Sequence, residues 1–350
     1  FVIVSAQGNR RSSFFHPVRT SFCRHDKGEH ATQGKAQRRF CVWASHANTR
    51  KRRSENVEGE LYVDSTCIDC DTCRWMAPAT FQRKDGQSAV FKQPESESAR
   101  ASALKAMLSC PTQSIHTTEK ARDIKEIQKL LPSLVDDNVY HCGYHSRSSF
   151  GAASYFIRSD QGNILVDSPR WSAPLVKQLE DMGGVNWMFL THKDDVADHA
   201  KYHEHFGCER ILDELELNSR IPSAEICLRG PDDHRLSDDV TFIQTPGHTR
   251  GHRVMLYKNK FLFSGDHVAW SHTRHHLVAF PDACWYSFAE QAKSMRKLLD
   301  YSFSHILPGH GAPYRAPDAA TMREQVARCA DWMLHWQDEP MPSHGVENWY

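Results

Sequence analysis

The sequence predicts an α+β protein with two folded domains behind a basic N-terminal segment. Three observations lead to this prediction. Cysteines cluster within residues 64–81 and recur at Cys110, in a stretch that also contains strand and helix patterns. Residues 140–315 contain several apolar strands that each end in Asp or His beside Gly or Pro, which lets the backbone turn sharply. Residues 1–53 show no sustained apolar periodicity.

The composition excludes two classes of partner. The chain has 350 residues, of which 40% are hydrophobic and 25% charged, as is usual for globular proteins. No apolar run approaches the roughly 18 residues of a spanning helix, so we expect no membrane partner. Residues 1–53 hold 12 Lys and Arg against Asp26 and Glu29, which leaves 31 basic and 41 acidic residues in the remainder. This acidic remainder argues against nucleic acid as a partner.

The segment 1–53 has the composition of an organellar transit peptide, because it is basic, poor in acids and contains Ser-rich patches. The sequence RRFCVWAS (38–45) resembles a plastid processing site ending at Ala44. We therefore predict a plastid stroma location, with the mitochondrion as the alternative. A basic disordered tail is the other interpretation. The chain begins with Phe1 rather than Met, so an upstream piece is expected to be missing.

The cysteine motif predicts an iron–sulfur cluster. Cys67, Cys70 and Cys73 follow a C-x2-C-x2-C pattern, and Cys110 precedes Pro111, the usual form of a remote fourth ligand. Zinc ribbons instead favour two separated C-x2-C pairs. The position where a two-cluster ferredoxin has another Cys-Pro reads Ala-Pro here. We therefore expect one [4Fe–4S] cluster.

The flanking patterns fit a small domain. Residues 59–64 and 88–93 alternate as strands, and 95–110 has helical spacing. Residues 59–118 thus resemble a single-cluster ferredoxin domain, and 119–138 is expected to be a helical linker. The seven other cysteines show no pairing pattern, which favours free thiols over a disulfide scaffold.

The second domain, predicted at 139–350 with a C-terminal helix at 321–336, carries its candidate ligands at strand ends. These are Asp167, the loop THKDDVADH (191–199), His248, Asp266 and His310. Their order and type resemble the metallo-β-lactamase superfamily, in which an Asp, an H-x-H-x-D-H loop, a PGHT-like turn, a GD strand end and a final GH follow one another. The resemblance implies an αββα sandwich with two mixed sheets face to face. The DACWYSF segment (282–288) resembles relatives of plants, algae and cyanobacteria that carry a ferredoxin domain before this fold.

The loop 191–199 departs from the family pattern twice: Asp194 replaces the second His, and two extra residues precede the terminal Asp-His. Carried over, the resemblance implies one metal held by His192, Asp194 and His248, and a second held by Asp198, His199 and His310. Asp266 would bridge both metals. Asp195 is an alternative to Asp194, because the insertion leaves the register open. The alternative without metal is that Asp194 or Asp195 caps the following helix.

The carboxylate at the second His position suits iron or manganese better than an all-His face does, so we expect one or two divalent metals, zinc or iron. The flavodiiron relatives in the superfamily also carry an acid there. Three further residues are expected near the centre: Asp167, His267 as a donor or proton shuttle, and Cys284 as a packed neighbour. His203 and His205 are not expected to be ligands.

These features predict a metal-dependent hydrolase of a small-molecule substrate, with Asp266 holding the metals and Asp198 orienting the nucleophile. The alternative is an iron-dependent oxidoreductase or dioxygenase-like enzyme that uses the cluster for electron transfer with a partner. A third possibility is a non-catalytic assembly or sensor protein. No G-x-G-x-x-G or P-loop motif is present, so no nucleotide-binding fold is expected.

Overall fold

The computed structural model describes residues 50–336. The predicted transit peptide therefore lies outside the described residues, apart from residues 50–53. These four residues belong to the first domain: Arg53 is buried and donates to the carbonyl oxygen of Ser88 at 2.6 Å, and the backbone of Arg52 pairs with that of Asp64 in an isolated antiparallel β-bridge. No helix in the described range is long and apolar enough to span a membrane.

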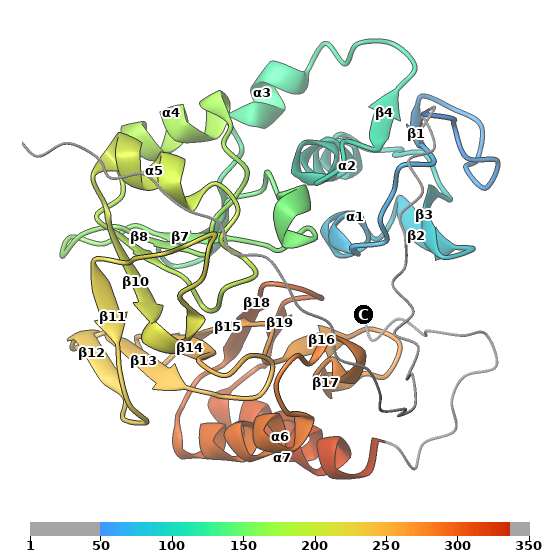
Figure 1. Ribbon diagram of the computed structural model, residues 1–350. Helices are drawn as coiled ribbons and strands as arrows, with labels where there is room; N and C mark the ends of the chain where they lie inside the picture. The colour runs from blue at the N-terminus through green and yellow to red at the C-terminus, as the bar shows by residue number, and fades with distance from the viewer. Residues whose placement is uncertain (1–49, 337–350) are drawn as a thin grey trace, which may run out of the picture. The chain divides into compact units, whose positions relative to one another are not determined.

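The first domain is a small α+β unit. Its elements are β1 (Leu61–Val63), α1 (Thr72–Met76), β2 (Phe81–Lys84), β3 (Gln87–Val90), α2 (Glu97–Ser109) and β4 (Ile115–Thr117). β1 pairs with β4, and β2 pairs with β3, both antiparallel. Ser96 caps the start of α2, because its side chain accepts a hydrogen bond from the Ala99 amide and so satisfies a free helix donor. Figure 1 shows α1 and α2 next to these strands.

The predicted linker contains less helix than expected. α3 (Ile124–Gln128) is short, and residues 133–136 form β5 (Ser133–Asp136), the edge strand of the next sheet. The sheet order is β11-β10-β9-β8-β7-β6-β5. Its other strands are β6 (Val139–His141), β7 (Tyr155–Ile157), β8 (Ile164–Val166), β9 (Trp187–Phe189), β10 (Glu209–Asp213) and β11 (Ile226–Leu228).

A second sheet has the order β12-β13-β14-β15-β18-β19. Its strands are β12 (His234–Ser237), β13 (Val240–Gln244), β14 (Arg253–Tyr257), β15 (Phe261–Gly265), β18 (His305–Pro308) and β19 (Tyr314–Arg315). A hairpin of β16 (Ala269–Ser271) and β17 (His276–Val278) follows β15. The helices are α4 (Ala173–Asp181), α5 (His199–Phe206), α6 (Phe288–Lys297) and α7 (Ala319–His335), with short 3-10 turns η1 (Arg147–Ser149), η2 (Glu214–Glu216), η3 (Pro281–Ala283) and η4 (Leu298–Asp300).

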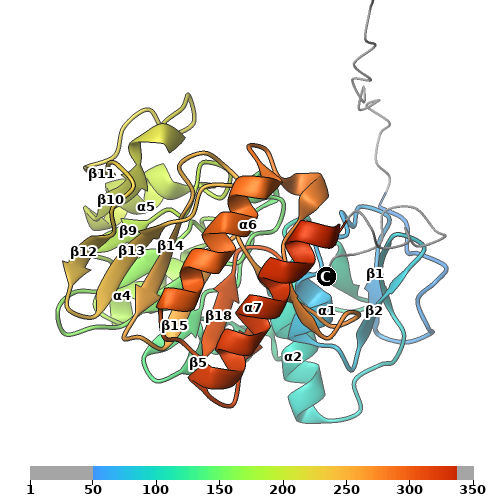
Figure 2. The same cartoon turned by 90° about the horizontal axis from the view of Figure 1, so that it is seen from below.

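Side-chain alternation explains the layering. In β14, Met255 and Tyr257 face the other sheet, where they join one cluster with Phe189, whereas Val254 and Leu256 pack in the cluster of α6 and α7. Phe189 stacks on Phe242 across the two sheets, with ring centroids 4.6 Å apart. α4 and α5 cover the outer face of the first sheet. α6 and α7 cover the second sheet, as Figure 2 shows from below. The predicted αββα sandwich is confirmed.

Strand direction places the candidate ligands. β8, β9 and β10 run parallel to one another, and β15 runs parallel to β18. β13 is separated from β15 by one antiparallel strand, so it also runs in the direction of β15. The carboxyl ends of parallel strands meet at one edge of a sheet. The residues that follow β8, β9, β13, β15 and β18 therefore gather there.

Candidate metal centre

The first ligand is oriented by a chain of hydrogen bonds below it. Asp167, which follows β8, accepts from the Thr191 amide at 2.8 Å and from the Thr191 hydroxyl at 3.0 Å. Because the same hydroxyl donates its proton to Asp167, it accepts a hydrogen bond from His192 Nδ1 at 3.0 Å. The Nε2 lone pair of His192 is thereby directed toward the centre. Burial lowers the pKa of His192 to about 3, which keeps the imidazole neutral, the form that binds metals.

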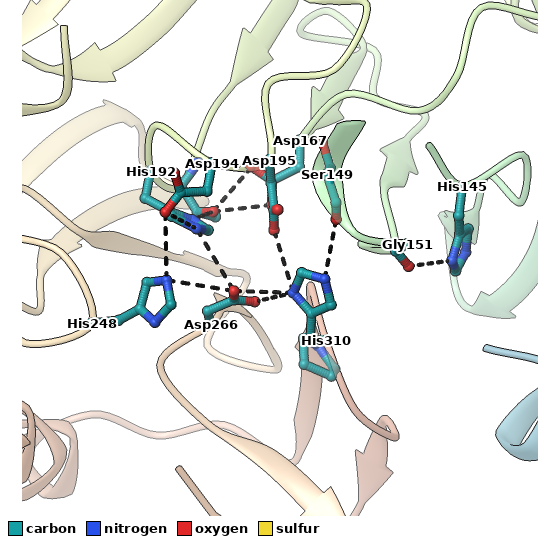
Figure 3. A network of polar contacts seen from close by, with 12 residues as sticks. His145, Ser149, Gly151, Asp167, His192, Asp194, Asp195, His248, Asp266 and His310 are labelled. Atoms are coloured by element: carbon teal, nitrogen blue, oxygen red, sulfur yellow. Dashed lines mark hydrogen bonds and ion pairs between the residues drawn. The ribbon is translucent and has the colours of Figure 1, made fainter. Parts of the chain in front are cut away.

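One set of ligand atoms surrounds a common point, as Figure 3 shows. His192, Asp194 and His248 offer atoms within 4.8 Å of one another. The Nε2 atoms of His192 and His248 lie 3.8 and 3.9 Å from Asp194 Oδ2. They lie 3.7 and 3.5 Å from Asp266 Oδ2. Ligands at 2.0–2.2 Å from a tetrahedral ion are separated by about 3.3–3.6 Å, so these separations need little adjustment.

A second, overlapping set lies on the other side of Asp266. It consists of His192, Asp195 and Asp266, again within 4.8 Å. His310 joins this side, because its Nδ1 lies 2.8 Å from Asp266 Oδ1 and 3.9 Å from Asp195 Oδ2. Gly309 permits the close approach, since a Cβ there would stand 2.7 Å from Asp195 Oδ2. Asp266 thus faces both sets, the position expected of a bridging ligand.

The unpaired atoms of this cluster fit a cation. Buried polar atoms normally have hydrogen-bond partners, and an unpaired one is costly. Within residues 50–336, the buried atoms without a partner include His192 Nε2, Asp194 Oδ2, both carboxylate oxygens of Asp195 and both ring nitrogens of His248. Burial and the charge of Asp266 raise the pKa of Asp195. Divalent ions would satisfy these atoms, apart from the second ring nitrogen of His248, so the residues present fit one or two metals.

The structure does not bring Asp198 and His199 into this cluster, and their predicted roles as ligands to the second metal are corrected. Asp198 Oδ2 accepts from the Trp171 amide at 2.8 Å, and Oδ1 pairs with Lys201 at 2.7 Å. His199 begins α5 and donates from Nε2 to the carbonyl oxygen of Arg220 at 3.1 Å. The physical reason is that Val196 packs into the core, so the chain turns before the terminal Asp-His pair. Asp195, rather than Asp198 or His199, lies with His192 and Asp266 in the second set.

Two predicted neighbours lie close to the ligands without joining them. His267 is fully buried, and its ring stands 5.9 Å from that of His252. Neither ring nitrogen of His267 has a hydrogen-bond partner among the described residues. Cys284 donates from Sγ to the carbonyl oxygen of Gly247 at 3.1 Å, which supports the turn before His248.

Two supporting residues were missed by the sequence analysis. His252 is fully buried, and its Nε2 accepts from the Asp266 amide at 3.3 Å. Its only signal was a second His in PGHTRGH. Glu216 is fully buried and accepts from the Lys193 amide at 3.1 Å and from the Gly251 amide at 2.6 Å. It thereby ties the His192 loop to the His248 turn. No motif surrounds Glu216, so the sequence held no signal for it.

The four motif cysteines line one pocket in the first domain. Backbone amides point at two of them: Ser88 donates to Cys67 Sγ at 3.4 Å, and Ser114 donates to Cys110 Sγ at 3.2 Å. Burial raises the pKa of Cys70 to about 12, so the thiolate form needs bound iron. This pocket, with its donors aimed at sulfur, fits a cluster.

One turn connects the two centres. Gly151 lies so close to the cluster pocket that a Cβ there would stand 3.0 Å from Cys70 Sγ. His145 donates from Nδ1 to the carbonyl oxygen of Gly151 at 2.7 Å. Two residues earlier, the carbonyl oxygen of Ser149 accepts from His310 Nε2 at 3.1 Å. Figure 3 shows this line of residues from His310 to His145.

Comparison with known families identifies the first domain. Residues 63–117 match the family model described as the 4Fe-4S single cluster domain of Ferredoxin I. The match lies within the predicted range 59–118 and contains all four motif cysteines. This part of the chain is therefore a single-cluster ferredoxin-type domain.

The second domain is similar to proteins of the metallo-β-lactamase superfamily. A β-lactamase-like protein 2 homolog of Drosophila melanogaster is 24% identical over 221 residues, which covers 55% of this chain and 69% of the relative. A solved archaeal superfamily protein of Sulfolobus tokodaii is 13% identical, with a TM-score of 0.43, and covers 61% of this chain and 92% of its own. ETHE1 of Myxococcus xanthus is 16% identical, with a TM-score of 0.42, and covers 59% and 92%.

FIM-1 of Pseudomonas aeruginosa, solved in a mono-zinc form, is 16% identical with a TM-score of 0.42, and covers 51% of this chain and 83% of its own. The described chain joins two classes of domain. A single-cluster ferredoxin domain precedes a domain with the metallo-β-lactamase fold.

Proposed function

We propose that the chain is a metal-dependent hydrolase of a small-molecule substrate. The observation that carries this proposal is Asp266, which faces two sets of unpaired ligand atoms at the floor of an open cleft. The cleft has a volume of about 440 Å³ and is lined by Asp194, Asp195, His248 and His310 among others. This volume lies within the range of sites that bind small molecules.

The metals would be held by His192, Asp194, His248 and Asp266 on one side, and by Asp195, Asp266 and His310 on the other. Bound divalent ions lower the pKa of water and polarise a carbonyl or phosphoryl oxygen. Asp195, rather than Asp198, would then orient the attacking water. One of the two unpaired oxygens of Asp195 can receive the proton of the attacking water.

Contacts at both ring nitrogens fix the orientation of His310. Its Nε2 donates to the Ser149 carbonyl, which leaves Nδ1 facing Asp266 and Asp195. Burial alone would lower the pKa of His310, but the two carboxylates raise it to about 10. Binding of a cation must therefore displace a proton from Nδ1. Three carboxylates in the ligand set favour iron or manganese more than an all-imidazole set would, and zinc remains compatible.

An iron-dependent oxidoreductase is the second candidate, because one specific observation favours it. The turn that contacts Cys70 through Gly151 also contacts His310 through Ser149. Such a connection would serve electron transfer between the cluster and a redox-active metal held near His310. A hydrolase does not need it.

Metal analysis of anaerobically purified protein, together with assays of turnover, separates the two candidates. The hydrolase proposal expects a divalent ion in addition to the iron of one cluster, with manganese, iron and zinc all compatible with the ligand set, and no redox turnover. It also expects hydrolysis of simple carboxylic esters or thioesters that ceases on chelation and returns with the metal. Iron in excess of the cluster, with oxygen or electron consumption and no hydrolysis, would overturn it in favour of the oxidoreductase.

A further inference from the structure

Aromatic side chains frame the mouth of the cleft. Phe150 is 52% exposed, and its ring centroid lies 6.2 Å from that of His310. Trp285 is 65% exposed, and its ring centroid lies 6.3 Å from that of His248. Both rings line the cleft, as does Phe280. Large aromatic side chains so exposed beside a site of buried ligands indicate a surface that binds an apolar group.

Hydrogen bonds fix the backbone of both aromatic residues. Phe150 has φ +49°, a conformation that a bulky residue adopts at a cost, and its amide donates to the carbonyl oxygen of Arg147 at 3.2 Å. The amide of Trp285 donates to the carbonyl oxygen of His248 at 2.8 Å. Each ring is therefore attached to the backbone that carries or supports a ligand. The apolar surface is consequently part of the site.

Arg220 places a positive charge on the same cleft. Its guanidinium donates to the carbonyl oxygens of Asp194 at 3.3 Å and Ser148 at 3.2 Å, and so spans two walls. A guanidinium has five N–H donors, so donors remain for an anion. Arg220 is an exposed residue of the cleft lining. An anionic group in the cleft would meet it without displacing a metal ligand.

The charge at the centre itself favours a neutral reacting group. Asp194, Asp195 and Asp266 supply three negative charges, so two divalent ions would leave about +1 and one ion about −1. A phosphoryl group would bring further negative charge to a centre that has little positive charge to offer. An ester or thioester carbonyl is neutral and is not disfavoured in this way.

We infer that the substrate is a carboxylic ester or thioester that carries an aromatic or similarly bulky apolar group and a separate anionic group. This inference rests on the proposed hydrolase function and specifies its substrate class. The carbonyl carbon gains the oxygen of water, the bond to the alcohol or thiol breaks, and the leaving group takes the proton. Phe150 and Trp285 contact the apolar group, and Arg220 pairs with the anion.

Three succinate esters test this class on metal-loaded protein. Monobenzyl succinate has the ring and the anion, monomethyl succinate lacks the ring, and benzyl methyl succinate lacks the anion. We expect kcat/KM for monobenzyl succinate to exceed that of each other ester by about tenfold. Equal rates for monobenzyl succinate and benzyl methyl succinate would overturn the requirement for an anionic group. Equal rates for the two half-esters would overturn the requirement for an aromatic group.

Substitutions test which side chains cause the preferences for the anionic group and for the benzyl group. Arg220→Gln should abolish the preference for the half-ester over the diester and keep the preference for benzyl, whereas Arg220→Lys should retain both. Trp285→Ala and Phe150→Ala should reduce only the benzyl preference. If Arg220→Gln leaves the anion preference intact, the assignment is wrong.

Binding separates a failure of this inference from a failure of the proposed function. N-benzylsuccinamic acid, an amide that resists hydrolysis, should bind by calorimetry and should bind about tenfold more weakly to Arg220→Gln. Binding of the amide without hydrolysis of any ester would overturn the hydrolase and leave the ligand class standing. Ester hydrolysis without discrimination would overturn the ligand class alone.

Discussion

His310 donates from Nε2 to the carbonyl oxygen of Ser149 at 3.1 Å. This bond attaches the last ligand in the chain to the turn that packs against the cluster pocket. The turn is therefore in contact with both centres, and Gly151 and Ser149 are the residues through which a change at one centre reaches the other. That contact provides the first prediction.

Gly151→Ala should disturb both centres. The new Cβ would stand 2.8 Å from Cys70 Cβ and 3.0 Å from its Sγ, so the turn or the cysteine must move. We expect a loss of more than half of the cluster iron and sulfide, together with weaker metal binding at His310, measured by metal analysis and titration. Gly230→Ala is the control, because φ is also positive there but no atom lies within 4 Å of the added Cβ. A normal cluster in Gly151→Ala would contradict the close contact.

Asp195→Asn should weaken metal binding, whereas Asp198→Asn should not. Both oxygens of Asp195 are unpaired and face Asp266 and His310, while Asp198 is engaged by Trp171 and Lys201. We expect at least a tenfold increase in the metal Kd for Asp195→Asn and less than a twofold change for Asp198→Asn, measured by competition with a chelating dye. The reverse order would restore Asp198 as a ligand.

Glu216→Gln should reduce metal affinity without direct contact with the metal. The carboxylate accepts from the amides of Lys193 and Gly251, and so fixes the spacing of the two ligand loops. Loss of such a support typically costs about 10–100-fold in metal affinity. The neighbouring Glu214→Gln, which removes only an exposed pair with Arg229, should leave it unchanged. If Glu216→Gln destabilised the metal-free protein but left its metal affinity unchanged, Glu216 would be purely structural.

Acid should weaken the fold partly through Glu225. Hydrogen bonds from Arg210 lower the pKa of Glu225 from 4.5 to about 2. A depressed carboxyl pKa contributes stability that is present above pH 4.5 and is lost as pH falls toward 2. Glu225 is about one-third exposed, so solvent reduces the contribution to about 1 kcal/mol.

The variant Glu225→Gln should therefore unfold more easily in urea at pH 7. Its difference from the unmodified protein should shrink between pH 5 and pH 3. Glu204→Gln, at an exposed position, serves as the control. A difference that stays constant with pH would show that packing rather than charge is responsible.

The strand-end ligands could be predicted because each follows an apolar strand at a Gly or Pro turn, and parallel strands bring such ends together. His192, Asp194, His248, Asp266 and His310 meet for this reason. In the second set, Asp266 and His310 could be predicted, but the place of Asp195 in it could not, because it depends on which side of Val196 the chain leaves the core. The role of Glu216 could not be predicted, because a single carboxylate that accepts from two backbone amides leaves no pattern in the sequence.

The domain contact was equally hidden from the sequence. Gly151 is an unremarkable residue in SSFGAAS, and only its position next to Cys70 in space makes it significant. Arg53 was assigned to the N-terminal segment because it ends a basic run. Its burial against Ser88 depends on contacts 35 residues away, which local composition does not report.

The ligands are divided between the two layers of the sandwich: His192, Asp194 and Asp195 extend from the first sheet, and His248, Asp266 and His310 from the second. Ions held there would link the two sheets, in addition to the hydrogen bonds that Glu216 and Ser149 already make across this edge. Uptake of metal would then slow the opening of the sandwich, because separation of the layers would have to release the ion first. The lifetime of the protein in a cell would consequently follow the supply of that metal, independently of whether any substrate is being turned over.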